Sequence, residues 1–151
     1  MLSQKVRYTI RALQELARRH DHGELTHLVD LATTQNIPAK YLTVILSELA
    51  REGLVHSVRG KNGGYRLALP PVDIRYGDIV RIMRGSIALV PCASRYAHEK
   101  CKNCLAEDEC RLRSLMLMVR DRTAQVLDEI TLADALPPPL DLWDEEPEAV
   151  S

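Results

Sequence analysis

Residues 53–69 of the chain read GLVHSVRGKNGGYRLAL. Two short runs rich in β-forming residues, 54–58 and 65–69, flank a turn that contains Asn62-Gly63. Asn-Gly between two such runs is a strong signal for a β-hairpin. The tip of this hairpin, residues 59–64, combines Arg59 and Lys61 with three glycines. We therefore expect a narrow, positively charged loop.

Three helices are predicted before the hairpin. Apolar residues at three- and four-residue steps mark a first helix, with Ser3 as a suitable cap, and a second over residues 26–34. A third begins at Pro38, whose missing amide hydrogen costs nothing in a first helical turn, and runs to Glu52 before Gly53. Buried faces are expected at Val6, Ile10, Leu13, Leu16 and Ala17 in the first helix and at Leu28, Val29, Leu31 and Ala32 in the second.

Two helices joined by the turn 35–37 and followed by a hairpin make a winged helix-turn-helix. We predict a mainly α-helical fold with a small β-hairpin wing that binds double-stranded DNA. The third helix would face the major groove, where apolar groups can touch thymine methyls. The wing would lie in a minor groove or on phosphates, although glycine-rich turns often only connect strands. The candidate DNA contacts are Lys40, Tyr41, Thr43 and Val44 on the helix, and Arg59, Lys61, Asn62, Gly63 and Gly64 on the wing.

The charge is distributed unevenly along the chain. The net charge is −1, but residues 1–91 carry 13 Lys and Arg against 8 Asp and Glu. Residues 137–151 carry 5 acidic residues, no basic one and several prolines, which is typical of a disordered tail. No apolar run is long enough to cross a bilayer and no secretory signal is apparent, so we expect a cytoplasmic protein. No catalytic constellation is present, and we do not expect an enzyme.

All four cysteines fall between residues 92 and 110, with the spacing Cys92-x8-Cys101-x2-Cys104-x5-Cys110. Several thiolates on one polar loop are what an iron-sulfur cluster, 2Fe-2S or 4Fe-4S, requires. Only Cys101 and Cys104 have the short spacing of a zinc knuckle, so zinc is an alternative and unligated thiols are another. His98 is a further candidate ligand in the loop.

A long amphipathic helix is predicted after the cysteines, over residues 111–132. Cys110 would stand at its N-terminus, where the helix dipole favours a thiolate. Its apolar stripe has no evident partner in the chain, so we expect the same helix of a second copy to cover it and form a homodimer, with Arg113, Arg120 and Arg122 at the solvent or seam edges. The stripe consists of Leu112, Leu115, Met116, Val119, Val126, Leu127 and Ile130.

Over about residues 2–136 the sequence resembles the Rrf-two (Rrf2) family of bacterial winged-helix regulators. The resemblance rests on Tyr41-Leu42, Gly53-Leu54-Val55, the wing motif 58–67, Ile74-x4-Ile79-Val80, the spaced cysteines and Ile130-Thr131-Leu132. The cysteine-bearing branch, with the iron-sulfur regulator IscR and the nitric-oxide-sensing repressor NsrR, is the more similar. The resemblance implies a homodimeric DNA-binding transcriptional regulator, expected to be a repressor, whose cluster controls operator affinity in response to redox, nitric oxide or iron-sulfur status.

The resemblance also implies ligands. Cys92, Cys104 and Cys110 fall where the family has its three cluster cysteines. The family's fourth ligand does not carry over, because Arg113 stands where IscR-like proteins have a His and Arg7 where NsrR-like proteins have an acidic residue. Cys101 is extra to the pattern and is the expected replacement, which would give an all-cysteine site.

The predicted organisation has five segments. They are a winged helix-turn-helix over residues 1–70, a linking helix over 71–91, the cysteine loop over 92–110, a dimerisation helix over 111–136 and the acidic tail over 137–151. A rival reading is an iron-sulfur electron-transfer or redox-adaptor protein. The winged helix argues against it, because an electron carrier has no use for a helix shaped to enter a DNA groove.

Overall fold

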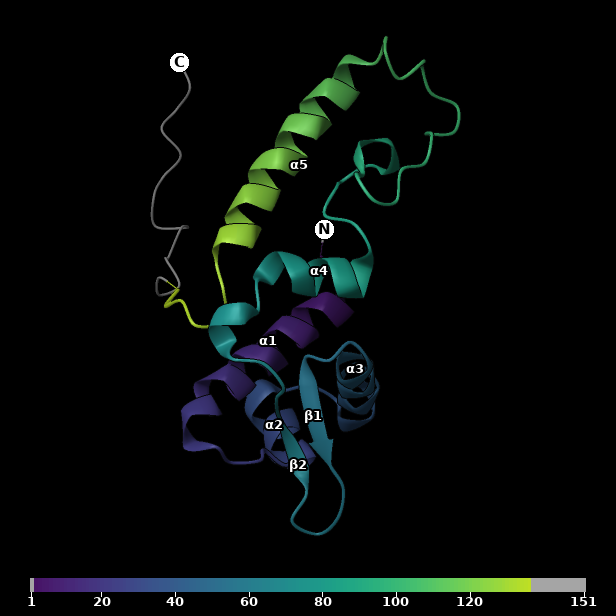
Figure 1. Cartoon of the computed structure of the whole chain (residues 1–151). Helices are drawn as coiled ribbons and strands as arrows, with labels where there is room; N and C mark the ends of the chain where they lie inside the picture. Colours follow the sequence, from purple (N-terminus) through teal and green to yellow (C-terminus); the bar gives the residue numbers. More distant parts are fainter. Residues whose placement is uncertain (1, 137–151) are drawn as a thin grey trace, which may run out of the picture.

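The computed structural model describes residues 2–136, and this part of the chain contains five α-helices and one two-stranded antiparallel sheet. Their bounds are α1 Gln4–Arg18, α2 Leu28–Gln35, α3 Ala39–Arg51, β1 Val55–Val58, β2 Gly64–Leu67, α4 Tyr76–Arg84 and α5 Arg111–Glu129. Figure 1 shows α1 to α3 and the hairpin as one lobe, with α4 lying across α1 and α5 rising away from the lobe. The predicted fold class is confirmed. The predicted tail lies outside the described residues.

Local signals in the sequence account for the helices of this lobe. The Ser3 hydroxyl accepts a hydrogen bond from the Val6 amide at 3.3 Å and caps α1. After α3, Gly53 adopts a left-handed backbone with a φ of 76°, which glycine reaches without the steric cost that other residues bear. A single core joins the three helices to the hairpin, and its fully buried members include Leu13, Leu31, Leu42, Ile45, Leu46, Leu49 and Ile74.

Two expectations for the second helix are wrong. It begins at Leu28 rather than at residue 26, because Thr26 exchanges two backbone hydrogen bonds of 2.8 and 2.9 Å with Tyr65 of the wing. Val29, expected on the buried face, is 69% exposed. A helix of eight residues turns only one narrow side to the core, and Leu31 and Ala32 occupy that side.

The wing is a regular hairpin whose strands pair from Val55 with Leu67 to Val58 with Gly64. A Cβ atom added at Gly63 would overlap the carbonyl oxygen of Val58, and one added at Gly64 would lie 2.7 Å from that of Thr26. The two glycines thus allow the backbone to close tightly at the base of the loop. Because Thr26 precedes α2, the wing is also fixed to the helix-turn-helix.

The last helix is shorter than predicted and has a partner in its own chain. α5 ends at Glu129, and Thr131 forms an isolated β-bridge with Arg75 just before α4. Leu127 and Ile130 pack against the core of the lobe, so the lower end of the predicted stripe is used within the protomer. Neither α5 nor any other described helix has the length and apolar character needed to cross a membrane.

An ion pair with two parallel hydrogen bonds, Arg81–Asp128, connects α4 and α5. Arg81 donates to Asp128 at 2.7 and 2.8 Å. A Cβ added at Gly77, one turn earlier in α4, would overlap the Asp128 carboxylate. The absence of a side chain at residue 77 therefore makes room for this pair, which fixes the base of α5 on α4.

Candidate nucleic-acid interface and cysteine pocket

The outer face of α3 carries the side chains predicted to meet DNA. Lys40, Tyr41, Thr43 and Val44 are all exposed, whereas Leu42 and its apolar neighbours face the core. The Thr43 hydroxyl donates to the Ala39 carbonyl oxygen at 2.9 Å, which leaves its methyl group for apolar contacts. The Tyr41 ring packs edge to face on the Tyr8 ring of α1, with 5.7 Å between the ring centroids, so α1 helps to position Tyr41.

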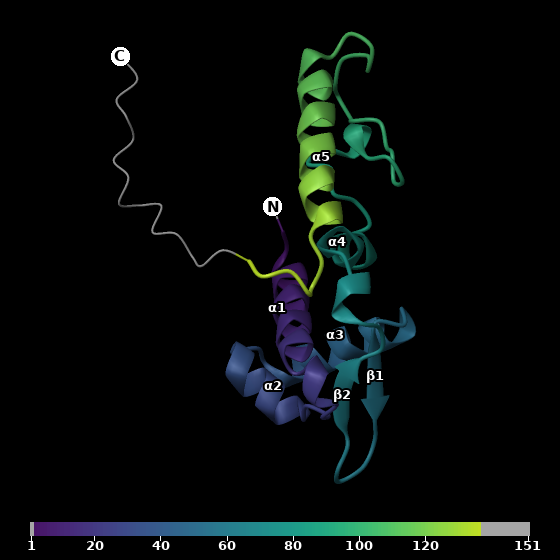
Figure 2. The same cartoon turned by 60° about the vertical axis from the view of Figure 1, so that its left-hand side comes forward.

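The five wing candidates divide into two groups. Arg59, Lys61 and Asn62 are exposed at the tip of the hairpin, which projects from the lobe below the strands in Figure 2. Gly63 and Gly64 are buried and lie against backbone atoms. Their position suits the shaping of the loop, and the exposed side chains are the ones available to a nucleic acid.

The four cysteines line one pocket at the N-terminus of α5. Its volume is about 470 Å³, and its wall also includes Lys100, Glu107, Asp108 and Arg113. Cys92 is buried in the short 3-10 helix Pro91–Ala93, Cys101 and Cys110 are half-buried, and Cys104 is exposed. Cys110 is the N-cap of α5, as predicted. Within residues 2–136, no three Cys, His, Asp or Glu side chains stand close enough together to hold a single metal ion.

Cys92 and Cys101 both line this pocket, and Cys101 affects the pKa of the Cys92 thiol. Burial raises the pKa of the Cys92 thiol, and the hydrogen bond with Cys101 and the charge of that residue raise it further. The nearby Arg113 guanidinium acts in the opposite direction on the same pKa. His98, the other candidate ligand, lies outside the pocket wall and pairs through Nε2 with Glu107 Oε1 at 2.8 Å.

Two arginines of α5 bind the backbone of the cysteine loop. Arg113 donates to the Cys92 carbonyl oxygen at 3.1 Å, and Arg120 donates to the Ala93 carbonyl oxygen at 2.8 Å. Their side chains are only 27% and 17% exposed, so the expectation that these two lie at a solvent edge is wrong, whereas Arg122 is exposed. Backbone carbonyls far away in the chain are their partners, and the sequence pattern carries no signal for such contacts.

The opposite side of α5 is apolar and open. None of the 19 residues of α5 is fully buried. Leu112, Leu115, Met118 and Val126 are each more than half exposed, whereas Ala124 and Leu127 face the protomer. Four large apolar side chains along one edge of an extended helix form a surface of the kind that a second protein chain covers.

Comparisons with known proteins agree with this architecture. The family model described as "Rrf2: Iron-dependent Transcriptional regulator" matches residues 2–138. An HTH-type transcriptional regulator of Rhodobacter capsulatus described as rrf2-like is 37% identical over 138 residues, which cover 90% of this chain and 92% of the relative.

Two solved structures show the same likeness in three dimensions. The structure of CymR (YrzC), the global cysteine regulator of B. subtilis, matches with a TM-score of 0.70 and 35% identity over 87% of this chain and 92% of its own. The structure of T. potens IscR matches with a TM-score of 0.67 and 31% identity over 89% of this chain and 84% of its own. The likeness thus extends along nearly the whole chain in each case.

Proposed function

Because the chain belongs to the Rrf2 family of DNA-binding transcriptional regulators, we propose that it is a homodimeric repressor whose affinity for its operator is set by an iron-sulfur cluster on the cysteine loop. The family consists of transcriptional regulators and not of enzymes. The rival role in electron transfer has no support from these relatives. The observation that carries the proposal is the convergence of all four cysteines on one pocket.

The DNA-binding surface combines α3 and the tip of the wing. Lys40, Tyr41, Thr43 and Val44 would enter the major groove, where the Thr43 methyl and Val44 suit thymine methyl groups. Arg59, Lys61 and Asn62 would extend the contact to a minor groove or to phosphates. The wing is tied to the segment just before α2 through Thr26 and Tyr65, so the wing and the helix-turn-helix can act as one rigid surface.

The donor set of the pocket fits an iron-sulfur cluster. Thiolates are the ligands that such clusters use, and the space of about 470 Å³ exceeds what one metal ion fills. Cys92, Cys104 and Cys110 would be three of the ligands. Cys101 would be the fourth because it lines the same pocket as the other three cysteines, while His98 lies outside the pocket wall and is engaged by Glu107. A bound cluster would supply a redox-sensitive centre. Zinc is the alternative occupant, but it would require at least three of the ligating side chains to move closer together.

The dimer would form through α5. Its exposed apolar edge has no cover within the protomer, and the isologous pairing of two such helices buries it symmetrically. Two α3 helices would then be held at a fixed separation, as a two-fold operator requires.

A continuous set of contacts connects the cysteine loop to the DNA-binding lobe. Arg113 and Arg120 tie the loop backbone to α5, the Arg81–Asp128 pair ties α5 to α4, and α4 packs on α1. A change in the order of the loop can therefore alter the angle between α5 and the lobe. Only a difference in DNA affinity between two such arrangements can switch binding.

Anaerobic purification of the full chain tests the proposal. We expect visible absorption together with iron and acid-labile sulfide. A protein that carries zinc alone, or no metal after reconstitution with iron and sulfide, would contradict the iron-sulfur assignment.

A further inference from the structure

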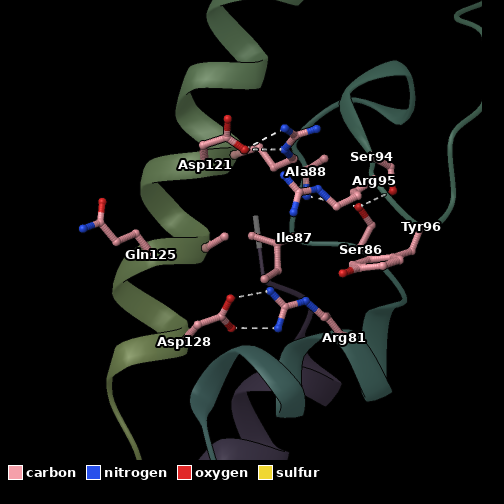
Figure 3. A pocket seen from close by; sticks show the side chains of 12 residues that line it. Arg81, Ser86, Ile87, Ala88, Ser94, Arg95, Tyr96, Asp121, Gln125 and Asp128 are labelled. Atoms are coloured by element: carbon pink, nitrogen blue, oxygen red, sulfur yellow. Dashed lines mark hydrogen bonds and ion pairs between the residues drawn. The ribbon is translucent and has the colours of Figure 1, made fainter.

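A second pocket lies between α4, the loop 86–96 and α5. It has a volume of about 290 Å³ and shares no residue with the cysteine pocket. Figure 3 shows its wall from close by, with Arg81 and Asp128 at the base, Asp121 on α5 above them, and the loop residues Arg95 and Tyr96 facing the helix.

The wall of this pocket carries an excess of positive charge. It contains the guanidinium groups of Arg81, Arg95 and Arg120 against two carboxylates. Asp128 binds Arg81 at 2.7 Å, and Asp121 binds Arg120. Among the described residues, Arg95 has no carboxylate within ion-pair distance and is therefore a cation available to an incoming group. Arg95 is an exposed residue of the loop.

The remaining wall is suited to a small organic molecule. Ile87, Ala88 and Ala124 provide apolar surface, and the Tyr96 hydroxyl points into the space in Figure 3. The volume is at the lower end of the range of ligand sites, which begins at about 300 Å³. Guanidinium groups bind carboxylates and phosphates through paired hydrogen bonds.

We propose that this pocket binds a small organic anion, a carboxylate or phosphate ester with a short carbon skeleton, as an effector. Both kinds of ligand would place an anionic group against Arg95 and an apolar carbon skeleton against Ile87 and Ala124. The pocket and the exposed apolar edge of α5 lie on different sides of the helix, because Ala124 and Asp128 face the protomer while Leu115 and Val126 do not.

Occupancy would influence the cysteine loop. Arg120 lines the pocket and also donates to the Ala93 carbonyl oxygen, directly after Cys92. A ligand that shifts Arg120 thus acts on the backbone at Cys92, and by linkage the state of the loop acts on ligand affinity. This coupling depends on the proposed function, whereas binding of the anion does not.

Calorimetric titration of the full-length protein tests the site, with glutarate, glycerol 3-phosphate and inorganic phosphate as probes in a chloride buffer of constant ionic strength. We expect saturable binding of glutarate or glycerol 3-phosphate, and whichever binds identifies the anionic group. Arg95→Gln should weaken that binding at least about tenfold. Arg122→Gln, which removes the same charge from an exposed position of α5, should leave it unchanged.

Three results would overturn the proposal. They are no saturable binding of any probe, binding of inorganic phosphate alone, and equal weakening by Arg95→Gln and Arg122→Gln, which would indicate general charge screening. Because Arg95 is exposed, its replacement by Gln should not unfold the chain, and circular dichroism verifies this. The titration requires no iron in the protein, so its failure and that of the iron-sulfur proposal are distinguishable.

Discussion

Arg81 of α4 and Asp128 of α5 form a bidentate salt bridge, with Nη1–Oδ1 and Nη2–Oδ2 distances of 2.7 and 2.8 Å. The hydrogen bonds from Arg81 lower the pKa of Asp128, and they outweigh the opposing effect of burial. Forty-seven residues separate the two side chains in sequence. The pair is therefore a tertiary contact that sets the long helix on the DNA-binding lobe.

Asp128→Asn should lower the free energy of unfolding by about 1 kcal/mol at pH 7, a modest value because both side chains are partly exposed to water. The folded carboxyl has the lower pKa, so its contribution is complete above the unfolded value of about 3.9 and is lost as the pH falls below it. Urea unfolding at pH 7 and pH 3 measures the effect. If the free energies of unfolding of the parent and the variant differed equally at both pH values, the charge of Asp128 would not contribute to stability.

Arg59→Ala should weaken DNA binding by about 1 to 3 kcal/mol if Arg59 reads a groove, and should reduce the salt slope by about one if it meets only phosphate. The probe is a duplex that the protein itself selects from a random-sequence library. Arg84→Ala removes the same charge from an exposed position at the end of α4 and serves as the control. Affinity and salt slope unchanged by Arg59→Ala would remove the wing from the interface.

Val126→Asp should convert the dimer into a monomer that binds DNA poorly, because dimerisation would bury an unpaired carboxylate. Val126 is 55% exposed in the protomer, so the change should not disturb the fold itself. Thr33→Asp adds the same charge to an exposed position of α2 and should remain dimeric. Light scattering gives the mass, and a Val126→Asp protein of dimer mass would place the seam elsewhere.

Cys101→Ser should cause loss of iron and sulfide as severe as that caused by Cys92→Ser or Cys110→Ser, because each change removes one of four thiolates. His98→Ala should have little effect, since His98 pairs with Glu107 outside the pocket wall. Iron, sulfide and absorption of the anaerobically purified variants provide the comparison. If Cys101→Ser retained the full parental content while His98→Ala lost it, the histidine would be the fourth ligand.

The elements predicted well from sequence are those with local signals. Ser3, Gly53 and Asn62-Gly63 act through the backbone of their own neighbourhood, so the helix start, the helix end and the hairpin could each be predicted from a few residues. The exposed face of α3 followed from helical periodicity in the same way.

Contacts between distant segments could not be predicted by such rules. The sequence pattern predicts Arg113 and Arg120 as edge charges of the helix. Their guanidinium groups instead bind the backbone carbonyls of Cys92 and Ala93, 21 and 27 residues earlier in the chain. Periodicity predicts the stripe of α5 as one surface, but Ile130 packs against the lobe while Leu112 stays exposed, because the surroundings of the helix change along its length. Periodicity identifies an apolar side without identifying what covers it.

The most direct test of the account compares DNA affinity with and without the cluster. The same protein preparation is titrated against the selected duplex at fixed salt, once as purified anaerobically and once after removal of iron by chelation. We predict affinities that differ by about 5- to 150-fold, the usual range of coupling between two sites. Equal affinities for the loaded and the stripped protein would contradict control of DNA binding by the cysteine loop.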